Sequence, residues 1–508
     1  MYFESITDVC SGIQKKDFIA KVNNFVRMTE LLAFKYAVDA ETRDSNTSNQ
    51  TLKYLKEMGF LKSACDFDKV KRLLGAVTYH RLINATNICS KHKKDIGSKL
   101  KKTNNKERLK EQKKTSKQSK PIVIDLFCGA GGLSHGFVEA GFKVRLALDN
   151  NKESIDTYTY NHAETPYKNI LHCDIQTVVS QLDEYLDADI DVVMGGPPCQ
   201  GFSSANKQRV ANDKRNVLYK QFVKVIEKAM PKAALMENVP GILPYANQIM
   251  QDLATITGNI KGKKVSYISN YKILDSSNFG IPQRRKRIFF LAIREDIAKN
   301  KKITPDQIFQ DIIYEGSKYR KHTLAEALCG LKTLKAPSEK NTTEKNDEFS
   351  GCKIEINNLE KSQNHYLKRL NKKNKTHEFV FNHKARYLND VNREIYKRLN
   401  QGEDATNHKI KHIMPYAHRN NIFKDKYYKL YANKPSRTIT AHLKMDCHSH
   451  IHPYEVRSIT PREAARIQSF PDDYFFLGAY LKTYQQIGNA VPPLLANCIA
   501  QVLKKHIK

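Results

Sequence analysis

Short apolar stretches alternate with amphipathic stretches between residues 121 and 296. Alternation of this kind predicts a mostly parallel β-sheet with helices on both of its faces. The pattern therefore predicts that these residues form an α/β domain. The strand candidates are residues 121–127, 143–149, 191–196, 233–238 and 287–293.

The chain outside this domain divides into regions with different patterns. Residues 1–90 space their apolar side chains at helical intervals, which predicts a helical N-terminal extension. Residues 297–435 are charged and only weakly periodic, which predicts a separate and more variable domain. Residues 436–508 are rich in recognisable motifs again.

Composition limits the class of protein. The 508 residues suffice for more than one domain, and 40% of them are hydrophobic, as in soluble globular proteins. The sequence has no run of eighteen apolar residues, and its N-terminus does not have the pattern of a signal peptide, so the protein is predicted to stay in the cytoplasm, where it is made. The ten cysteines form no C-x-x-C pair, which argues against a zinc site and favours reduced thiols. No metal is expected.

Positive charge points to a polyanionic partner. The net charge is +32 and the pI about 9.6, which favours nucleic acid, although an AT-rich genome also encodes many lysines. Residues 91–120 hold thirteen Lys or Arg against three acidic residues, which is typical of a flexible basic linker. This linker is either a solvated tether or an arm that binds phosphates.

A glycine-rich turn follows the first strand candidate. Gly129, Gly131 and Gly132 permit a tight turn and the close approach of a ligand to the backbone. Asp149 ends the next strand, near the roughly 20-residue spacing at which an acid reaches a ribose hydroxyl. Asp174 follows the next strand and could accept a hydrogen bond from an adenine amino group. The turn departs from G-x-G-x-x-G, so a dinucleotide is not favoured.

Three further segments carry side chains that suit catalysis. Cys199 follows two prolines, which would hold its thiol in one position, although a lone cysteine is usually a small buried residue. Glu237 ends an apolar strand, where partial burial would raise its pKa and suit proton donation. Arg285 and Arg287 alternate on one face of a strand-like segment and could bind a carbonyl or phosphate. The alternative for these arginines is an edge strand with solvated charges.

The order of these motifs closely resembles that of the bacterial DNA (cytosine-5)-methyltransferase family. The resemblance covers residues 121–296 and 433–508 and implies a Rossmann-like domain that uses S-adenosylmethionine and double-stranded DNA. Residues 297–435 would be the target recognition domain, and residues 436–508 would return to the catalytic domain. The segments similar to the family's first, fourth, sixth, eighth, ninth and tenth motifs are DLFCGAGGLSHGF, GGPPCQGFS, ENVPGI, QRRKRIFF, RSITPREAARIQSFPDDY and QIGNAVPPLLA.

The resemblance assigns catalytic roles. Cys199 would add as a thiolate to C6 of a cytosine that is flipped out of the duplex. Glu237 would protonate N3, and Arg287, helped by Arg285, would bind the O2 side of the ring. The base that removes the C5 proton is not assigned. The residues expected to hold the DNA are Gln200 and Ser203.

The same resemblance places the cofactor. Phe127 and the backbone around Gly129 and Gly131 would cradle the methionine part, Asp149 the ribose and Asp174 the adenine. The family usually has Glu in place of Asp149 and often a large aromatic residue in place of Asn150. The absence of this aromatic stacking partner could weaken cofactor binding. The residues expected to flank or close the site are Asn150, Ile175, Leu218, Asn489 and Val491. The ninth-motif residues expected to organise the recognition domain are Arg462, Arg466 and Gln468.

Other functions fit part of this pattern. A tRNA cytosine-5 methyltransferase has similar motifs, but the long recognition region and the N-terminal extension favour DNA. Residues 49–77 could form two helices and a turn that regulate transcription, or part of a plain helical bundle. A catalytically dead binder is disfavoured by the catalytic residues. We expect a monomer that protects DNA in a restriction–modification system, with a cognate endonuclease encoded nearby and no stable complex between them.

Overall fold

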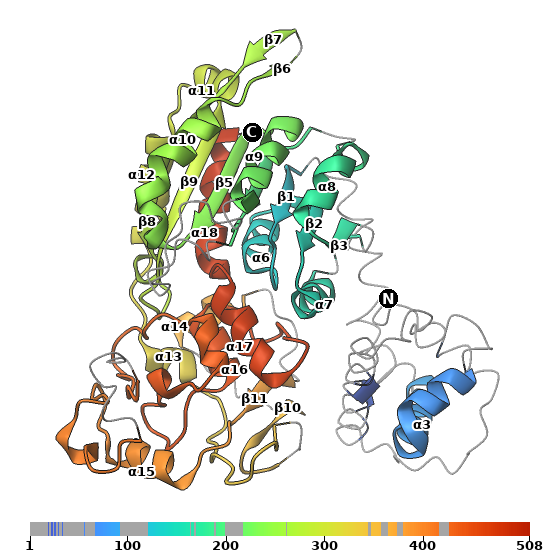
Figure 1. Cartoon of the computed structure of the whole chain (residues 1–508), viewed down its shortest axis with the longest axis vertical. Coiled ribbons are helices and arrows are strands. Elements are labelled where there is room, and N and C mark those ends of the chain that lie inside the picture. The colour runs from blue at the N-terminus through green and yellow to red at the C-terminus, as the bar shows by residue number, and fades with distance from the viewer. Residues whose placement is uncertain are drawn as a thin grey trace. The chain divides into compact units, whose positions relative to one another are not determined.

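A computed structural model describes the chain at residues 67–91 and 120–507 and at a few residues between 19 and 55 (Figure 1). The chain divides into two compact units, residues 1–117 with 354–357 and residues 118–353 with 358–508. Each unit is described by itself. The description leaves out residues 163, 167–168, 187–188, 199–216, 261, 344–346, 357–363, 373–378 and 416–425.

The first unit contains helix α3, Phe67–Lys91, which is kinked at Gly75 (φ 72°). Thr29 is buried and helical, and its hydroxyl oxygen lies 3.5 Å from the sulfur of Cys89 in α3. The helical character predicted for residues 1–90 is confirmed where the structure describes them. Most of the possible regulator segment, residues 49–77, lies outside the described residues, so that interpretation stays a prediction.

The second unit is built on a seven-stranded sheet in the order β3-β2-β1-β4-β5-β9-β8. Strands β1 to β5 run parallel, and β9 and β8 are antiparallel additions at one end. The prediction of a mostly parallel α/β sheet is therefore confirmed. The strands are β1 Ile122–Leu126, β2 Lys143–Asp149, β3 Ile170–His172, β4 Val192–Gly195, β5 Ala233–Asn238, β8 Tyr267–Asp275 and β9 Lys286–Arg294, with a separate hairpin of β6 Gly258–Ile260 and β7 Lys263–Val265.

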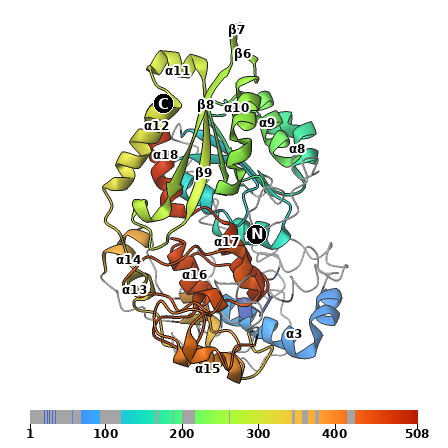
Figure 2. The same ribbon diagram turned by 60° about the vertical axis from the view of Figure 1, so that its left-hand side comes forward.

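Helices cover both faces of this sheet because successive strand residues point to opposite sides. In β9, Phe289 and Leu291 join one buried cluster and Ile288 and Phe290 join the other. Figure 2 shows α12 and α18 on one side of the sheet and α8, α9 and α10 on the other. The helices of the sheet layers are α6 Gly132–Glu139, α7 Lys152–Asn161, α8 Ile175–Gln181, α9 Val217–Ala229, α10 Ala246–Ala254, α11 Glu295–Lys301, α12 Pro305–Ser317 and α18 Pro493–Ile507.

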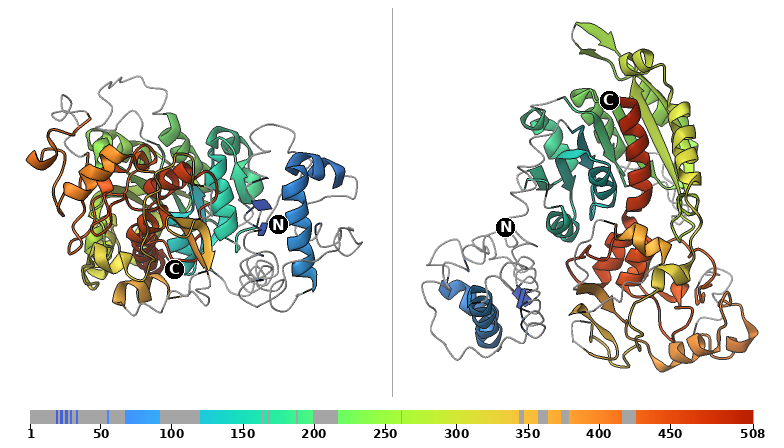
Figure 3. Two further views of the ribbon diagram at one scale, coloured as in Figure 1. Left: turned by 90° about the horizontal axis from the view of Figure 1, so that it is seen from below. Right: turned by 180° about the vertical axis from the view of Figure 1, so that it is seen from behind.

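The end of the described chain returns to its first strand. Helix α18 packs against α6, which directly follows β1, and the rear view in Figure 3 shows α18 lying along the sheet. The helices approach closely at Gly136 of α6. A Cβ at this position would lie 2.4 Å from the Cβ of Ala496 and 2.5 Å from the backbone nitrogen of Asn497.

Replacing Gly136 with alanine is expected to lower the free energy of unfolding by about 1–3 kcal/mol, because backbone of α18 must shift to admit the methyl group. The measurement is the urea midpoint of the full chain. Gly258→Ala is the matched control, since its Cβ would meet only the flexible end of Met230. Equal midpoints for the two variants would contradict a tight α6–α18 contact.

The remaining elements form a second lobe next to the sheet layers (Figure 1). Its small separate core includes Leu388, Ile395 and Tyr427. Helix α12 falls within the range predicted for a separate domain but packs on β8 and α18, so it lies with the sheet layers. The elements of this lobe are α13 Leu324–Leu328, β10 Gly351–Ile356, α14 His365–Leu370, β11 Phe379–Lys384, α15 Asp390–Arg398, α16 Pro461–Ile467 and α17 Tyr480–Asn489.

Candidate active site

The carboxyl ends of β1 to β5 share one edge of the sheet because these strands are parallel. In open α/β sheets, ligands bind at this edge, where the strand order reverses. Here the order reverses between β1 and β4. The glycine-rich turn after β1 and the segment that carries Cys199 after β4 therefore leave neighbouring strands, with Glu237 at the end of the next strand, β5.

The turn after β1 has three residues with left-handed backbone. Phe127, Gly129 and Gly131 have φ angles of 59°, 53° and 91°. Such an angle strains a residue like Phe127, and strain of this kind gathers at functional sites. A Cβ on Gly129 would meet no heavy atom within 4 Å. The turn therefore has the open backbone that a bound cofactor requires.

Asp149 fastens this turn to β2. Its Oδ2 accepts a hydrogen bond from the Gly129 nitrogen at 2.9 Å, and its Oδ1 accepts one from the Asn151 nitrogen at 2.8 Å. Burial raises the pKa of Asp149, whereas the backbone donors favour its charged form. The carboxylate thus orients the turn from the position that the resemblance assigns to ribose binding.

The other predicted cofactor residues differ in exposure. Asp174 caps α8 by accepting a hydrogen bond from the Gln176 nitrogen at 2.8 Å. A Cβ on Gly132 would lie 2.4 Å from the Val491 carbonyl oxygen, so the tenth motif packs directly on the turn. The exposed members are Asn150, Asp174 and Asn489, and the buried or half-buried members are Phe127, Ile175, Leu218 and Val491.

Two residues without a predicted role support the turn. The Tyr474 hydroxyl donates to the Ala130 carbonyl, and His162 Nε2 lies 3.2 Å from both the Gly131 carbonyl oxygen and the Tyr474 hydroxyl. A Cβ on Gly131 would lie 2.3 Å from His162 Nε2. Gly131 is therefore required for packing. No local pattern could reveal this contact, because Tyr474 lies more than 340 residues further along the chain.

Glu237 and Arg287 form an ion pair at the end of β5. Arg287 Nε lies 3.0 Å from Glu237 Oε1, but its N–H does not point at this oxygen, so the contact is ionic and not a hydrogen bond. The Glu237 side chain is 10% exposed and that of Arg287 is 15% exposed. A Cβ on Gly196 would lie 3.1 Å from Glu237 Oε2, so this glycine leaves room for the carboxylate. The structure thus brings together two of the predicted catalytic residues.

Cys199, Gln200 and Ser203 lie outside the described residues, so their positions stay predictions. The start of their loop is fixed by Asn238, a buried residue without a predicted role. Its side-chain amide donates to the Pro197 carbonyl at 3.1 Å and its Oδ1 accepts from the Val239 nitrogen at 2.8 Å. The loop therefore leaves the sheet beside Glu237.

Arg285 is buried and holds backbone instead of facing a ligand. Its Nη1 donates to the Ile439 carbonyl at 2.7 Å, and its Nη2 donates to the carbonyls of Gly488 and Ala490 at 2.9 and 3.1 Å. Strand β9 begins at Lys286, so Arg285 lies just outside the strand. The prediction that Arg285 and Arg287 alternate on one face of a strand therefore does not apply to Arg285. These contacts favour a structural role over the predicted contact with the base. The neighbouring β9 is an interior strand, so the edge-strand alternative is wrong.

The ninth-motif residues all bind the chain itself. Arg466 forms two hydrogen bonds to Asp472, at 2.6 and 2.9 Å, and Gln468 donates to the Ala490 carbonyl at 2.6 Å. Arg462 donates to the carbonyls of Phe381 and Pro471, the latter at 3.0 Å. These contacts agree with the predicted organising role.

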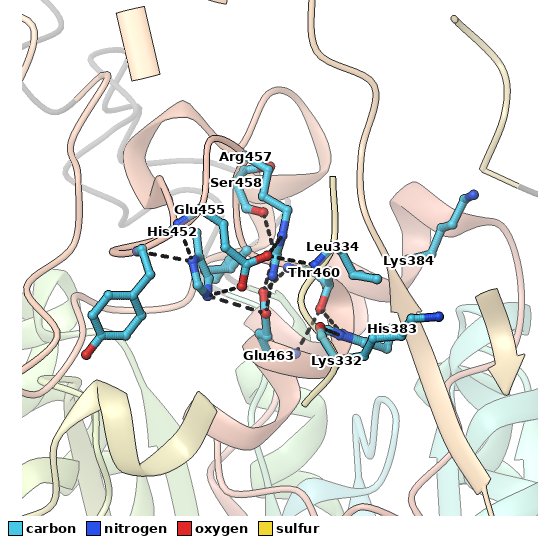
Figure 4. Close-up of polar contacts among 12 residues, drawn as sticks. Lys332, Leu334, His383, Lys384, His452, Glu455, Arg457, Ser458, Thr460 and Glu463 are labelled. Carbon is cyan, nitrogen blue, oxygen red and sulfur yellow. Dashed lines mark hydrogen bonds and ion pairs between the residues drawn. The ribbon is translucent and has the colours of Figure 1, made fainter. Parts of the chain in front are cut away.

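A buried ionic cluster lies at the start of the same motif (Figure 4). Arg457 donates to both oxygens of Glu463 at 2.8 and 2.7 Å, and to Glu455 at 2.9 Å. Burial alone would raise the pKa of Glu463, but the guanidinium holds it well below its ordinary value. Burial lowers the pKa of the adjacent His452 to about 3, so this ring is neutral. The cluster fixes α16, because Glu463 also accepts from the Thr460 nitrogen at its first turn.

Replacing Arg457 with methionine is expected to lower the free energy of unfolding by about 3–5 kcal/mol, because Glu463 is left as a buried charge. Lys299→Met, which removes an exposed ion pair with Glu295, is the control and should cost less than about 1 kcal/mol.

The stability of the wild-type protein should also depend on pH through Glu463. Since the pKa of Glu463 is lowered on folding, its contribution to the free energy of unfolding is present above the unfolded pKa and is lost as the pH falls. Urea titrations at pH 7 and pH 4 measure both effects, and equal losses for the two variants would contradict them.

Two general properties concern ligands and membranes. Within the described residues, no group of three or more His, Cys, Asp or Glu is arranged to hold a metal ion. None of the helices in the described part of the chain is long and apolar enough to cross a membrane. The fold and the strand-end site together define an α/β enzyme with an open cofactor turn beside a buried acidic group and its arginine partner.

Comparisons with known proteins agree with this class. The profile of the C-5 cytosine-specific DNA methylase family matches residues 122–505. The type II methyltransferase M1.HphI of Haemophilus parahaemolyticus is 33% identical and covers 75% of this chain and 86% of its own. The type II methyltransferase M.DdeI of Desulfomicrobium norvegicum is 32% identical over 75% of this chain and 87% of its own. A prophage-encoded E. coli structure, described as a DNA modification methyltransferase, has 25% identity and a TM-score of 0.56, covering 76% of this chain and 99% of its own.

The chain therefore belongs to the C-5 cytosine-specific DNA methylase family and is a DNA (cytosine-5)-methyltransferase. The resemblance of its motifs to that family is confirmed, as is the Rossmann-like fold class. Methyltransferases of this family use S-adenosylmethionine as methyl donor, and DNA is their substrate. Residues 1–121 lie outside the family match.

Proposed function

We propose that the enzyme methylates C5 of a cytosine that has been flipped out of double-stranded DNA, with Cys199 as nucleophile. The Cys199 thiolate adds to C6, the negative charge spreads over the ring, and Glu237 protonates N3. C5 then forms a bond to the transferred methyl group. Loss of the C5 proton to a base, return of the N3 proton to Glu237 and departure of the thiolate restore the aromatic ring.

The Glu237–Arg287 pair is the observation that carries this proposal. Asn238, the residue after Glu237, donates a hydrogen bond to the carbonyl of Pro197. Pro197 precedes Cys199 by only two residues, so the pair lies close to the start of the loop that carries Cys199. A carboxyl and a thiol from adjacent strand ends would meet the same ring from different sides. Arg287, through its charge, would keep Glu237 in place and bind the O2 side of the cytosine.

S-Adenosylmethionine supplies an electrophilic methyl group when bound. The turn at Gly129 fits this cofactor, because it has an open backbone and is oriented by the Asp149 carboxylate. Phe127 and the backbone of Gly129 would hold the methionine part, Asp149 the ribose, and Asp174 the adenine amino group. Asn150, Ile175, Leu218, Asn489 and Val491 would complete the walls.

The biological role that fits best is protection of DNA in a restriction–modification system. The relatives named above are type II methyltransferases, and such enzymes protect sites from a cognate endonuclease. Residues 297–435 would supply the target recognition domain, apart from α11 and α12, which pack on β8 and β9. We propose that the enzyme acts as a cytoplasmic monomer and forms no stable complex with an endonuclease.

Isotope transfer tests the proposed function. Purified enzyme is incubated with tritiated S-adenosylmethionine and either unmethylated bacterial DNA or unmodified tRNA. Label recovered as 5-methylcytosine in DNA is the expected result, and bisulfite sequencing then gives the recognised site. Label recovered only in tRNA would replace the DNA proposal with an RNA one. Label in neither, despite measurable S-adenosylmethionine binding, would also count against it.

A further inference from the structure

A segment of the second lobe is joined to the backbone just before β9, the strand that carries Arg287. Ser436 and Gln283 form a parallel bridge, and the Thr438 hydroxyl donates to the Arg284 carbonyl at 2.7 Å. Arg284 precedes Arg287, the partner of Glu237, by only three residues. Residues 441–447, which follow Thr438 in the sequence, are therefore anchored at their start to the backbone that leads into β9.

This segment is held as a tight loop from within. Residues Ala441–Lys444 form a short 3-10 helix, η11, and Cys447 has a φ of 60°, which is strained for a residue with a side chain. The Cys447 thiol donates to the Leu443 carbonyl at 2.9 Å, and both side chains are buried. The loop thus has one defined backbone path.

Arg386, from the segment after β11, fastens the loop from one side. Its Nη1 donates to the carbonyls of Leu443 and Lys444 at 3.3 and 3.4 Å, and its Nη2 donates to the Met445 carbonyl at 2.5 Å. One guanidinium therefore satisfies three successive carbonyls where η11 ends. A lysine could not reproduce this planar set of donors.

Helix α17 fastens the loop from the other side. A Cβ on Gly488 would lie 2.2 Å from the Thr440 carbonyl carbon and 2.4 Å from the Ala441 nitrogen, so the two backbones are in direct contact. Lys444 Nζ also donates to Gln485 Oε1 of α17 at 3.3 Å. The loop therefore cannot move independently of the lobe.

The fastened loop presents an apolar side chain outward. Met445 is 65% exposed, whereas Leu443 is 2% exposed. Exposed cations stand close in sequence to Arg287 and to the start of this segment, namely Arg284, Lys286 and Lys434. Cations of this kind suit phosphates, while an apolar tip on a rigid loop suits a base edge or the step between two bases.

We propose that Arg386 is a positioning residue that holds residues 441–447 as a rigid reading loop, through which Met445 makes an apolar contact to the bases next to the target cytosine. This inference rests on the proposed methylation of double-stranded DNA. Met445 determines part of the recognised sequence, and Arg386 acts through the loop without touching the DNA.

Four variants of the full chain test the reading loop: Arg386→Ala, Arg386→Lys, Met445→Ala and Arg393→Ala. Arg393 is the matched control, because it also binds carbonyls in this lobe, those of Ala336 and Leu388, but lies outside the loop. The readouts are KM for DNA, kcat, S-adenosylmethionine affinity and the spectrum of methylated sites in bisulfite-sequenced plasmid DNA.

Loss of a base contact predicts about a tenfold rise in KM for DNA and methylation of near-cognate sites for both Arg386 variants and for Met445→Ala. For these three variants we expect kcat within about threefold of wild type and an unchanged affinity for S-adenosylmethionine. For the control Arg393→Ala we expect an unchanged spectrum of methylated sites. If Arg386→Ala does not fold, Met445→Ala decides, since its side chain is exposed.

The outcomes separate this inference from the function on which it rests. If wild type methylates DNA and Met445→Ala keeps both the wild-type KM and the wild-type site spectrum, the reading loop is wrong and the methyltransferase proposal stands. A general loss of cofactor affinity in Arg386→Lys would assign Arg386 to folding alone. If wild type labels no DNA, both proposals fail.

Discussion

Methyl transfer is expected to fall below detection when Cys199 is replaced by alanine, because the proposed mechanism begins with addition of this thiolate to C6 of the cytosine. Among the described residues, burial raises the pKa of four cysteine thiols. These thiols are poor nucleophiles, because the thiolate is the reactive form. The pKa is about 11 for Cys447 and about 12 for Cys498. The other two thiols with a raised pKa are Cys128 and Cys173.

Covalent capture on DNA measures this directly. In DNA that contains 5-fluorocytosine, the methylated ring has no C5 proton to lose, so the bond between Cys199 and C6 persists and the complex survives denaturation. Wild type and the control Cys329→Ala should form this complex, and Cys199→Ala should not. Cys329 is an exposed residue of the second unit. A persistent complex with Cys199→Ala would show that another residue is the nucleophile.

Replacing Glu237 with glutamine is expected to lower the single-turnover rate by about 10²–10⁴-fold, the usual contribution of a positioned proton donor. Glutamine has nearly the same shape and still fits beside Gly196, but it cannot transfer a proton to N3 and no longer pairs with the charge of Arg287. DNA affinity should change little, because the loss concerns the transition state.

Rapid-quench methylation with saturating DNA tests this prediction. Glu227→Gln, an exposed carboxylate on α9, is the matched control and should keep the wild-type rate. A Glu237→Gln rate within threefold of wild type would remove Glu237 from proton transfer. A rate that is low at subsaturating DNA but normal at saturating DNA would mean that the residue acts in binding alone.

The sequence was sufficient to predict the elements whose signals are local. Strands β1, β2, β4, β5 and β9 have continuous apolar stretches, so all five were predicted near their observed bounds. Strand β8 was not among the strand candidates, because its residues YISNYKILD are largely half-buried or exposed at the sheet edge and their pattern is polar. Local pattern therefore identifies interior strands better than edge strands.

The site divides in the same way. Glu237 and Arg287 could be paired from their motifs, because β5 and β9 are neighbouring strands and both residues lie near the strand ends. Asn238 and Arg386 could not be assigned, since each acts through a carbonyl more than 40 residues away along the chain. The backbone contacts of Arg285 could not be predicted for the same reason: its partners at Ile439 and Gly488 are set by tertiary packing.

The contact between α18 and α6 has a consequence for the making of the protein. Helix α6 is translated more than 350 residues before α18, the helix that covers it and spans residues 493–507. Until then, the apolar side of α6 at Gly136 has no cover, and the growing chain carries exposed surface that favours aggregation. Closure then requires contacts across more than 350 residues, which slows folding. The contact between α18 and α6 is thus a late step in folding, and a lag should separate the synthesis of residues 493–507 from the first methylated DNA.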